Sequence, residues 1–455
     1  RAMVYGQDRG ARFAWRQQAA ALIYAANRIP EIADTIVAID DAMRWGYSFA
    51  MGPFEVWDAI GVTESVARME AEGMAVPAKV GEMLAAGHTH FYKEEKGARL
   101  YYDFTSKGYL PVPTSPTTIS IARLKGAGAT VETCPSASLV DLGDGVFCCE
   151  FHTKMNALNS ELVDFIHKSL AVVKDQAAGL VVGNQATGAR AAFSAGADLK
   201  EMVAAAQADK FDEIRAGIRH MQTAMQKARY APFPVVAAPY GLTLGGGCEV
   251  ALGADRMVAG AELYMGLVEV GVGLLPGGGG CLNLWKKLTA DLPKGVGKID
   301  RTPLFATVFQ DIAMAKVSTS AAEARHLGFL GARDRIVTNP DTLVGEAKRE
   351  VLTLLADGYQ APVPQKIKVI GRTAQGLVNA QLNDMQRAGF VSAYDAFIAK
   401  KVAFVIAGGD AAPESAVEED IILRLEEEAF IALLQEEKTQ ARIAHMLKTG
   451  KPLRN

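Results

Sequence analysis

Two glutamates that follow glycine-containing segments are the strongest candidates for reactive side chains in this sequence. Glu249 ends the run Gly245-Gly246-Gly247-Cys248-Glu249, and Glu269 ends the later segment 265–269. The apolar run at 235–238 predicts a buried strand, and the residues after the glycines predict the start of a helix. Glycines at such a junction leave backbone N–H groups open to a ligand, and the helix N-terminus adds positive potential. The turn therefore suits an oxygen atom that becomes negative during a reaction.

An upstream segment repeats this arrangement. Residues 180–183 predict a strand, and Phe193-Ser194-Ala195-Gly196-Ala197-Asp198 is a small-residue turn that opens a predicted helix. Two such turns can aim two amide donors at one carbonyl oxygen, which is the geometry of an oxyanion hole. Because Glu249 lies one helical turn beyond Gly246, its carboxylate can face whatever Gly246 binds. A glycine-rich turn with a surface glutamate is the alternative interpretation of the 245–249 segment taken alone.

In their order and spacing, the two segments resemble the enoyl-CoA hydratase/isomerase (crotonase) superfamily. Members of that superfamily form the two turns from Phe-x-Ala-Gly-Ala-Asp-Leu-Lys and Gly-Gly-Gly-Cys-Glu, and both motifs are present here. The resemblance implies that the amides of Ala195 and Gly246 bind a thioester oxygen and that Glu249 and Glu269 are the catalytic pair. It also implies substrate contacts at four further residues: Ala157, Gly196, Ala197 and Asp198.

The reaction that the resemblance implies is the hydration of trans-2-enoyl-CoA in fatty-acid beta-oxidation. Glu249 would hold and activate the water, and Glu269 would exchange a proton with the alpha carbon of the substrate. Two carboxyls that share one water cannot both ionise freely, so one should keep its proton well above the usual glutamate pKa of about 4.3. Two alternatives stay open: a double-bond isomerase or other CoA-thioester enzyme of the same fold, and a non-catalytic scaffold fragment.

The residues before the glycine-rich segments are predicted to form helices. They also carry a resemblance to a second protein family. Residues 39–58 carry an Ile-Asp…Gly-Pro-Phe…Asp pattern similar to the C-terminal helical domain of 3-hydroxyacyl-CoA dehydrogenases. In that family NAD binds a separate upstream Rossmann domain, and the sequence holds no Gly-x-Gly-x-x-Gly fingerprint. We therefore expect a fragment of a bifunctional beta-oxidation enzyme, with no cofactor in this chain and NAD only in the missing upstream domain. Four aromatic residues of the segment are expected in the helical core: Trp45, Phe49, Phe54 and Trp57.

The chain of 455 residues is long enough for several domains. Residues 1–105 are predicted to form an all-helical dehydrogenase-like domain, and the proline-rich stretch within 106–135 predicts a linker. The resemblance implies an α/β fold, a crotonase-type ββα spiral, at 136–360, followed by a helical C-terminal region at 361–455. Dense charge at 425–447 predicts a solvated helix face there.

Composition narrows the choice of partners. The net charge of −3 indicates no nucleic-acid or anionic-membrane surface, and 49% apolar residues support a substantial core. No apolar run approaches the ~20 residues of a membrane span, and the five cysteines lack metal-ligand spacing. We expect a cytoplasmic enzyme with a small-molecule acyl-CoA substrate and no metal, and its homo-oligomeric state stays open.

Overall fold

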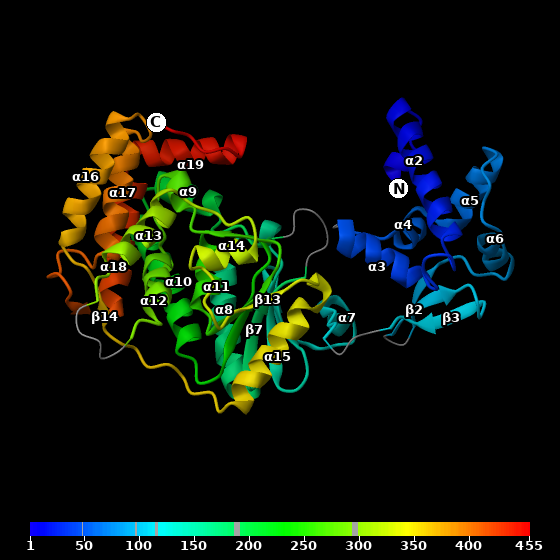
Figure 1. Cartoon of the computed structure of the whole chain (residues 1–455), viewed down its shortest axis with the longest axis horizontal. Helices are drawn as coiled ribbons and strands as arrows, with labels where there is room; N and C mark the ends of the chain where they lie inside the picture. Colours follow the sequence, from blue (N-terminus) through cyan, green and yellow to red (C-terminus); the bar gives the residue numbers. More distant parts are fainter. Residues whose placement is uncertain (48, 96–97, 114–116, 186–191, 294–298) are drawn as a thin grey trace. The chain divides into compact units, whose positions relative to one another are not determined.

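The computed structural model describes residues 1–47, 49–95, 98–113, 117–185, 192–293 and 299–455 (Figure 1). The chain forms two compact units, one spanning Arg1–Pro116 and one containing Thr117–Gln185 and Ala191–Asn455. Each unit buries its own hydrophobic core. Within the described residues, no helix combines the length and the apolar character that a membrane span requires.

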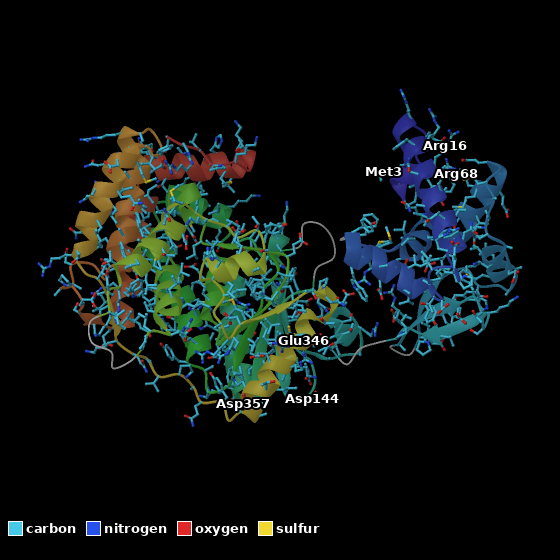
Figure 2. The ribbon with its side chains drawn as sticks, viewed as in Figure 1. Met3, Arg16, Arg68, Asp144, Glu346 and Asp357 are labelled. Atoms are coloured by element: carbon cyan, nitrogen blue, oxygen red, sulfur yellow. The ribbon has the colours of Figure 1, made fainter. Side chains whose placement is uncertain are left out.

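The first unit is helical up to Ala85, as predicted, and then forms a sheet that the sequence analysis missed. Its helices are α1 (Ala2–Tyr5), α2 (Arg9–Asn27), α3 (Ile36–Tyr47), α4 (Pro53–Ile60), α5 (Val62–Ala71) and α6 (Ala78–Ala85). The antiparallel sheet is β1 (Tyr92–Glu95), β2 (Ala98–Asp103) and β3 (Gly108–Pro111). Arg68, labelled in Figure 2, stacks its guanidinium over the Trp15 ring with 4.2 Å to the ring centre and so closes the α2–α5 contact.

Asp40 explains the Ile-Asp…Gly-Pro-Phe pattern in the first unit. Its carboxylate accepts hydrogen bonds from the Phe54 amide (2.9 Å) and the Tyr92 hydroxyl (2.8 Å), and thereby caps α4 and anchors β1. Any Cβ at Gly52 would lie 2.3 Å from the Asp40 Cβ, so only glycine fits there. Burial raises the pKa of Asp40 to about 7. The pattern is thus a structural clamp of this unit.

The aromatic residues of this segment divide into two groups. Phe54 and Trp57 are fully buried, as expected. Trp45 and Phe49 are 50% and 52% exposed, which corrects the prediction that they belong to the core. Their position at and beyond the last turn of α3 takes them away from the packed face that Ile36 and Ile39 define.

The second unit is built on two sheets of mostly parallel strands. The seven-stranded sheet has the order β13-β11-β9-β7-β6-β5-β4, and a three-stranded sheet has the order β12-β10-β8. The large sheet contains β4 (Thr130–Cys134), β5 (Ala137–Asp141), β6 (Val146–Phe151), β7 (Gly179–Gly183), β9 (Val235–Ala238), β11 (Arg256–Gly260) and β13 (Arg335–Val337). The small sheet contains β8 (Ala192–Ser194), β10 (Gly241–Leu244) and β12 (Leu263–Gly266). β7 and β9 are buried along their whole length, as parallel strands covered on both faces are.

Helices surround these sheets (Figure 1). Those before the C-terminal region are α7 (Ile121–Gly126), α8 (Ser160–Gln176), α9 (Leu199–Gln207), α10 (Phe211–Arg229), α11 (Gly246–Gly253), α12 (Gly280–Thr289), α13 (Thr302–Ala313), α14 (Ala321–His326) and α15 (Leu343–Ala356). Short 3-10 helices η1 (Lys154–Asn156), η2 (Glu269–Val272) and η3 (Pro340–Thr342) join them. The predicted α/β class, preceded by a helical region, is confirmed.

The C-terminal residues 361–455 belong to this second unit. They form α16 (Thr373–Arg387), α17 (Ala393–Ile406), α18 (Glu419–Leu434) and α19 (Glu437–Thr449), with the short pair β14 (Ile367–Lys368) and β15 (Ala416–Val417). The predicted solvated face at 425–447 is wrong for three charged residues, because Glu426 is 0% exposed and Glu427 and Arg442 are each 2% exposed. α18 packs against α10, α12 and α17, so more than one of its faces meets a partner. Glu427 is paired there with Arg215 (2.5 Å) and Arg219.

Candidate active site

Glu249 lies in the first turn of α11, immediately after the glycine-rich junction that follows β10. Its Oε1 accepts hydrogen bonds from the amides of Gly278 (2.7 Å) and Gly280 (2.8 Å), and the residue is 4% exposed. Gly245 makes the junction possible, since its φ of 52° with ψ of −124° is a conformation that glycine alone adopts without strain. The Glu249 carboxylate is thus buried beside the helix N-terminus.

Glu269 begins the 3-10 helix η2 after β12, and its carboxyl points at the same junction. A Cβ built on Gly245 would lie 3.1 Å from Glu269 Oε1, and one built on Gly246 would lie 3.9 Å from Glu249 Oε2. The Glu269 Oε2 atom is buried and has no hydrogen-bond partner within the described part of the chain. A buried polar atom left without a partner costs about 1–3 kcal/mol. The Glu269 Oε2 atom is therefore available to a water or a ligand in the site.

Burial raises the proton affinity of both carboxyls. It raises the pKa of Glu249 to about 7, and the Gly280 and Gly278 amides oppose that rise. Burial and then the nearby Glu249 charge raise the pKa of Glu269 well above its usual range. Burial and mutual repulsion therefore favour one proton shared by the pair. One protonated and one ionised carboxyl form an acid and base pair.

Two backbone amides face the space beside this pair. The Gly246 amide lies at the N-terminus of α11, and a Cβ built on Gly246 would be 3.6 Å from the Ala197 nitrogen. Among the residues that the structure describes, neither amide donates a hydrogen bond to another protein atom. Two unengaged donors side by side at a helix N-terminus are suited to hold one anionic oxygen.

The structure does not bring the Ala195 amide to this position. That amide donates to the Met155 carbonyl oxygen at 3.1 Å. Gly196, with φ of 98°, turns the chain between Ala195 and Ala197, so the two amides face different partners. A Cβ on Gly196 would lie 3.0 Å from the Leu244 carbonyl oxygen, which is why glycine occupies the turn. Ala197, predicted as a substrate contact, replaces Ala195 as the second candidate donor.

The other predicted substrate contacts lie along the same segment. The Ala157 carbonyl accepts a hydrogen bond from Thr153 Oγ1 (2.6 Å), and its neighbour Leu158 would touch a Cβ on Gly246 at 2.9 Å. Asp198 caps α9 by accepting from the Lys200 amide at 2.9 Å. The Asp198 side chain therefore positions a helix, and its role as a substrate contact stays a prediction.

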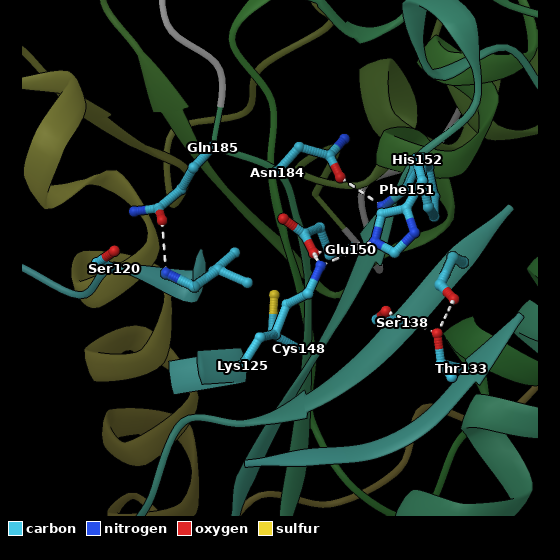
Figure 3. A network of polar contacts seen from close by, with 12 residues as sticks. Ser120, Lys125, Thr133, Ser138, Cys148, Glu150, Phe151, His152, Asn184 and Gln185 are labelled. Carbon is cyan, nitrogen blue, oxygen red and sulfur yellow. Dashed lines mark hydrogen bonds and ion pairs between the residues drawn. The ribbon is translucent and has the colours of Figure 1, made fainter. Parts of the chain in front are cut away.

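Asn184, which sequence reasoning missed, fixes the 193–198 segment from behind. It follows β7, and its side chain accepts from the Phe151 amide (2.6 Å) and donates to the Phe193 carbonyl (2.8 Å). Figure 3 shows the Asn184–Phe151 bond beside the Lys125–Glu150–His152 contacts at the end of β6. Asn184 is buried, so a polar residue directly after an apolar strand was the available indication.

Comparisons with known proteins identify the family to which the chain is similar. Residues 143–296 match the sequence model of the family described as Enoyl-CoA hydratase/isomerase. The chain is 42% identical over 457 residues to "Probable 3-hydroxyacyl-CoA dehydrogenase" of Bacillus subtilis (strain 168), covering 100% of this chain and 56% of that protein. It is 32% identical over 203 residues to "Probable enoyl-CoA hydratase echA8" of Mycobacterium leprae (strain TN), covering 44% of this chain and 67% of that protein.

Among solved structures, an enoyl-CoA hydratase from Bacillus halodurans has a TM-score of 0.46 and 15% identity, covering 68% of this chain and 99% of that one. The chain spans about half the length of the curated relatives that it matches along nearly its full extent. The similarity to the Bacillus subtilis protein runs through both units, and the family match falls on the unit that carries Glu249 and Glu269. The chain therefore belongs to the enoyl-CoA hydratase/isomerase (crotonase) family, with a helical unit fused in front of the crotonase-type unit.

Proposed function

We propose that the second unit adds water to the double bond of a trans-2-enoyl-CoA thioester and produces a 3-hydroxyacyl-CoA. The observation that carries this proposal is the buried Glu249–Glu269 pair on either side of the Gly245–Gly246 junction, next to two unengaged amides. Hydration of a thioester-activated double bond requires a base for the water, an acid for the alpha carbon and donors for the enolate-like oxygen. The site offers one group for each requirement.

In the proposed mechanism the thioester oxygen accepts hydrogen bonds from the Gly246 and Ala197 amides. These donors stabilise the negative charge that moves onto this oxygen as the beta carbon is attacked. Donors of this kind are commonly worth about 3 kcal/mol each in the transition state. The positive end of α11 acts in the same direction, because Gly246 is its first residue.

The two carboxyls move the protons. Ionised Glu249 takes a proton from the water while the oxygen of that water bonds to the beta carbon. Protonated Glu269 then gives its proton to the alpha carbon, so that H and OH have been added across the double bond. The raised pKa values of both carboxyls fit a pair that carries one proton between them. The pair holds one proton before and one after the reaction, and exchange with water returns it to Glu269.

The name of the Bacillus subtilis relative supports a second part of the proposal. We infer that this chain belongs to a beta-oxidation protein in which hydration is followed by oxidation of the 3-hydroxyacyl-CoA. Hydration itself needs no cofactor, and NAD would bind residues outside this sequence.

For this reason we expect the chain to bind NAD no more tightly than millimolar. Isothermal titration calorimetry would check this expectation, with the crotonyl-CoA titration of the same protein as the control for a folded sample. Micromolar NAD binding would contradict the division of labour between this chain and an upstream domain.

Hydration itself is tested with crotonyl-CoA by following the loss of the enoyl absorbance. Glu249→Gln and Glu269→Gln should each lower kcat roughly 10²- to 10⁴-fold, because each removes a proton-transfer group. Thioester affinity, measured by calorimetry, should change less than about threefold, since the amide donors stay in place. The exposed Glu262→Gln is the matched control and should keep full activity.

Two results would contradict this proposal, one its mechanism and the other its reaction. Near wild-type turnover in either site variant removes that residue from the mechanism. Conversion of a 3-enoyl-CoA to the 2-enoyl isomer, with no loss of the 2-enoyl absorbance in water, identifies a double-bond isomerase. An isomerase moves a proton between two carbons and needs one carboxyl, so the filling of both positions favours hydration.

A further inference from the structure

Glu426 is a third buried carboxyl close to the Glu249–Glu269 pair. It lies in α18, far along the chain from both, and is 0% exposed. Its Oε2 accepts from the Gly279 amide at 2.8 Å, and its Oε1 accepts from the Leu282 amide at 3.0 Å. These amides belong to the glycine run 277–280 and the first turn of α12.

The same glycine run holds Glu249 from its other side. The amides of Gly278 and Gly280 donate to Glu249, and the amide between them, Gly279, donates to Glu426. The successive amides of one short backbone segment therefore alternate between two carboxyls. Any shift of this backbone that follows a change at Glu426 moves the two donors that orient Glu249.

Contacts from α10 and α18 hold the first residue of the glycine run, Gly277. The amide at the centre of the run, that of Gly279, is held by Glu426. Gln222 Nε2 donates to the Gly277 carbonyl and to the Leu423 carbonyl of α18, both at 2.9 Å. A Cβ on Gly277 would lie 2.9 Å from the Phe430 ring. Among the described residues, Glu426 is the side chain that satisfies the Gly279 and Leu282 amides, and a buried amide left without a partner is destabilising.

The geometry points to Glu426 as a positioning residue for the catalytic carboxylate of Glu249, acting through the backbone of the 278–280 segment. This inference rests on the proposed function, in which Glu249 activates the water. The ordinary alternative is that Glu426 only caps α12 and stabilises the fold. A cap affects how much protein is folded, whereas a positioning residue also affects the chemistry of each folded molecule.

The pKa of Glu249 distinguishes a positioning role of Glu426 from a purely structural one, because only the loss of a positioning residue would raise it. Burial dominates the raised pKa of Glu249, and the Gly280 and Gly278 amides lower it. The titratable groups around Glu249 are Glu269 on η2, Cys248 on α11, Cys281 on α12 and Glu426 itself on α18. When the two amides lose their alignment, their lowering effect weakens and the pKa of Glu249 rises. Loss of the Glu426 charge alone has the opposite effect, because the two carboxylates repel each other. An acid side of the pH–kcat profile that moves to higher pH therefore identifies the lost amide alignment.

The test compares Glu426→Gln with the wild type in the full chain, using crotonyl-CoA hydration from pH 5 to pH 9. A glutamine keeps one acceptor oxygen and turns an NH₂ group toward the other amide, so the Gly279 or the Leu282 amide loses its partner. Rates are normalised to the number of thioester-binding sites, so that unfolded protein does not count. We expect kcat about ten- to a hundredfold lower, KM within about twofold, and the acid limb at higher pH.

Two further variants keep the outcome clear. Glu428→Gln, on the exposed side of the same helix, should match the wild type in kcat and pH profile. Glu426→Ala removes both acceptors and should lower kcat at least as much as Glu426→Gln at a temperature where it still binds thioester. A normalised kcat and an acid limb equal to wild type in Glu426→Gln would overturn the positioning role, even if the variant melts earlier. A wild-type chain without hydratase activity would instead overturn the proposed function, and the positioning role with it.

Discussion

Glu249 and Glu269 differ in how the protein satisfies their oxygens, and this difference has consequences for stability. Glu249 Oε1 has two amide donors, whereas Glu269 Oε2 has no partner within the described residues. Both carboxyls have a raised pKa because both are buried. A carboxyl whose folded pKa exceeds its unfolded value binds more protons when folded, so stability falls as the pH rises between the two values.

Glu249→Gln should therefore stabilise the chain in a pH-dependent way. The gain should be near zero below pH 4.3, where the wild-type carboxyl is protonated in both states, and should grow until the pH passes the folded pKa of about 7. Above that pH we expect about 1–3 kcal/mol. Urea unfolding at pH 5 and at pH 8 would measure it, with Glu262→Gln expected to show equal effects at both. A gain that is the same at both pH values would show that the Glu249 carboxyl is not desolvated.

The sequence was sufficient to identify the two glutamates of the site. It did not identify the second amide donor correctly, and it did not indicate Glu426. Glu249 follows Gly246 by one helical turn, and that local relation survives in the fold. The choice of Ala195 as the second donor failed because the left-handed turn at Gly196 separates its amide from that of Ala197. The role of Glu426 could not be predicted from local sequence, because its hydrogen-bond partners Gly279 and Leu282 are 147 and 144 residues away.

At the scale of elements, the site depends on how closely α11 approaches β8. A Cβ on Gly247 would lie 2.5 Å from the Ser194 Cβ and 2.7 Å from the Ser194 carbonyl oxygen. Backbone atoms cannot move aside cheaply, so a larger residue must push the helix away from the strand. That displacement would separate the Gly246 and Ala197 amides.

Gly247→Ala should therefore destabilise the chain by about 1–3 kcal/mol and lower hydration more than thioester binding. Gly217 in α10 supplies the matched control, because a Cβ there would meet nothing within 4 Å. Gly217→Ala should stabilise by about 0.5–1 kcal/mol, as alanine does in an open helix position. Urea denaturation and steady-state kinetics would check both variants. Equal stability of the two would mean that α11 has room that the structure does not show.

Local patterns predicted the elements that local forces determine. The strand, glycine junction and helix at 235–249 were readable because apolar and glycine positions are adjacent in sequence. The sheet β1–β3 was missed because β1 is rich in charge and half exposed. The solvated face assigned to α18 failed because charge spacing does not reveal that α10 supplies Arg215 and Arg219 as partners for Glu427.

At the scale of the whole molecule, the chain has two separate hydrophobic cores. The boundary at Pro116 and Thr117 falls within residues 106–135, but the prediction that this whole range is a linker is wrong, because it contains β3, α7 and β4. Residues 361–455 are helical as predicted and belong to the second unit. The sequence does not show that α17 and α18 pack on α12 and α10. Assigning those packing partners requires long-range contacts.

Residues 117–455 expressed alone should fold and hydrate crotonyl-CoA with kcat/KM within about threefold of the full chain, because every proposed site residue and its support lie in this unit. Calorimetry of the full chain should show two unfolding transitions, one of which the shortened chain retains. The rates of the isolated fragment and of the full chain are compared at the same concentration of thioester-binding sites. A single transition, or an inactive but folded fragment, would show that the first unit contributes to the site.

The contact between α18 and the glycine run also determines when the site can form during synthesis of the chain. Glu426 is synthesised 147 residues after Gly279, which at ordinary translation rates is a delay of roughly 7 to 30 seconds. Thr439, which donates to the Gly273 carbonyl at 2.7 Å, follows later still. During that interval the nascent chain contains both glutamates and both turns, yet lacks the residues that hold them. The native arrangement of the site can therefore form only after α18 and α19 have been synthesised.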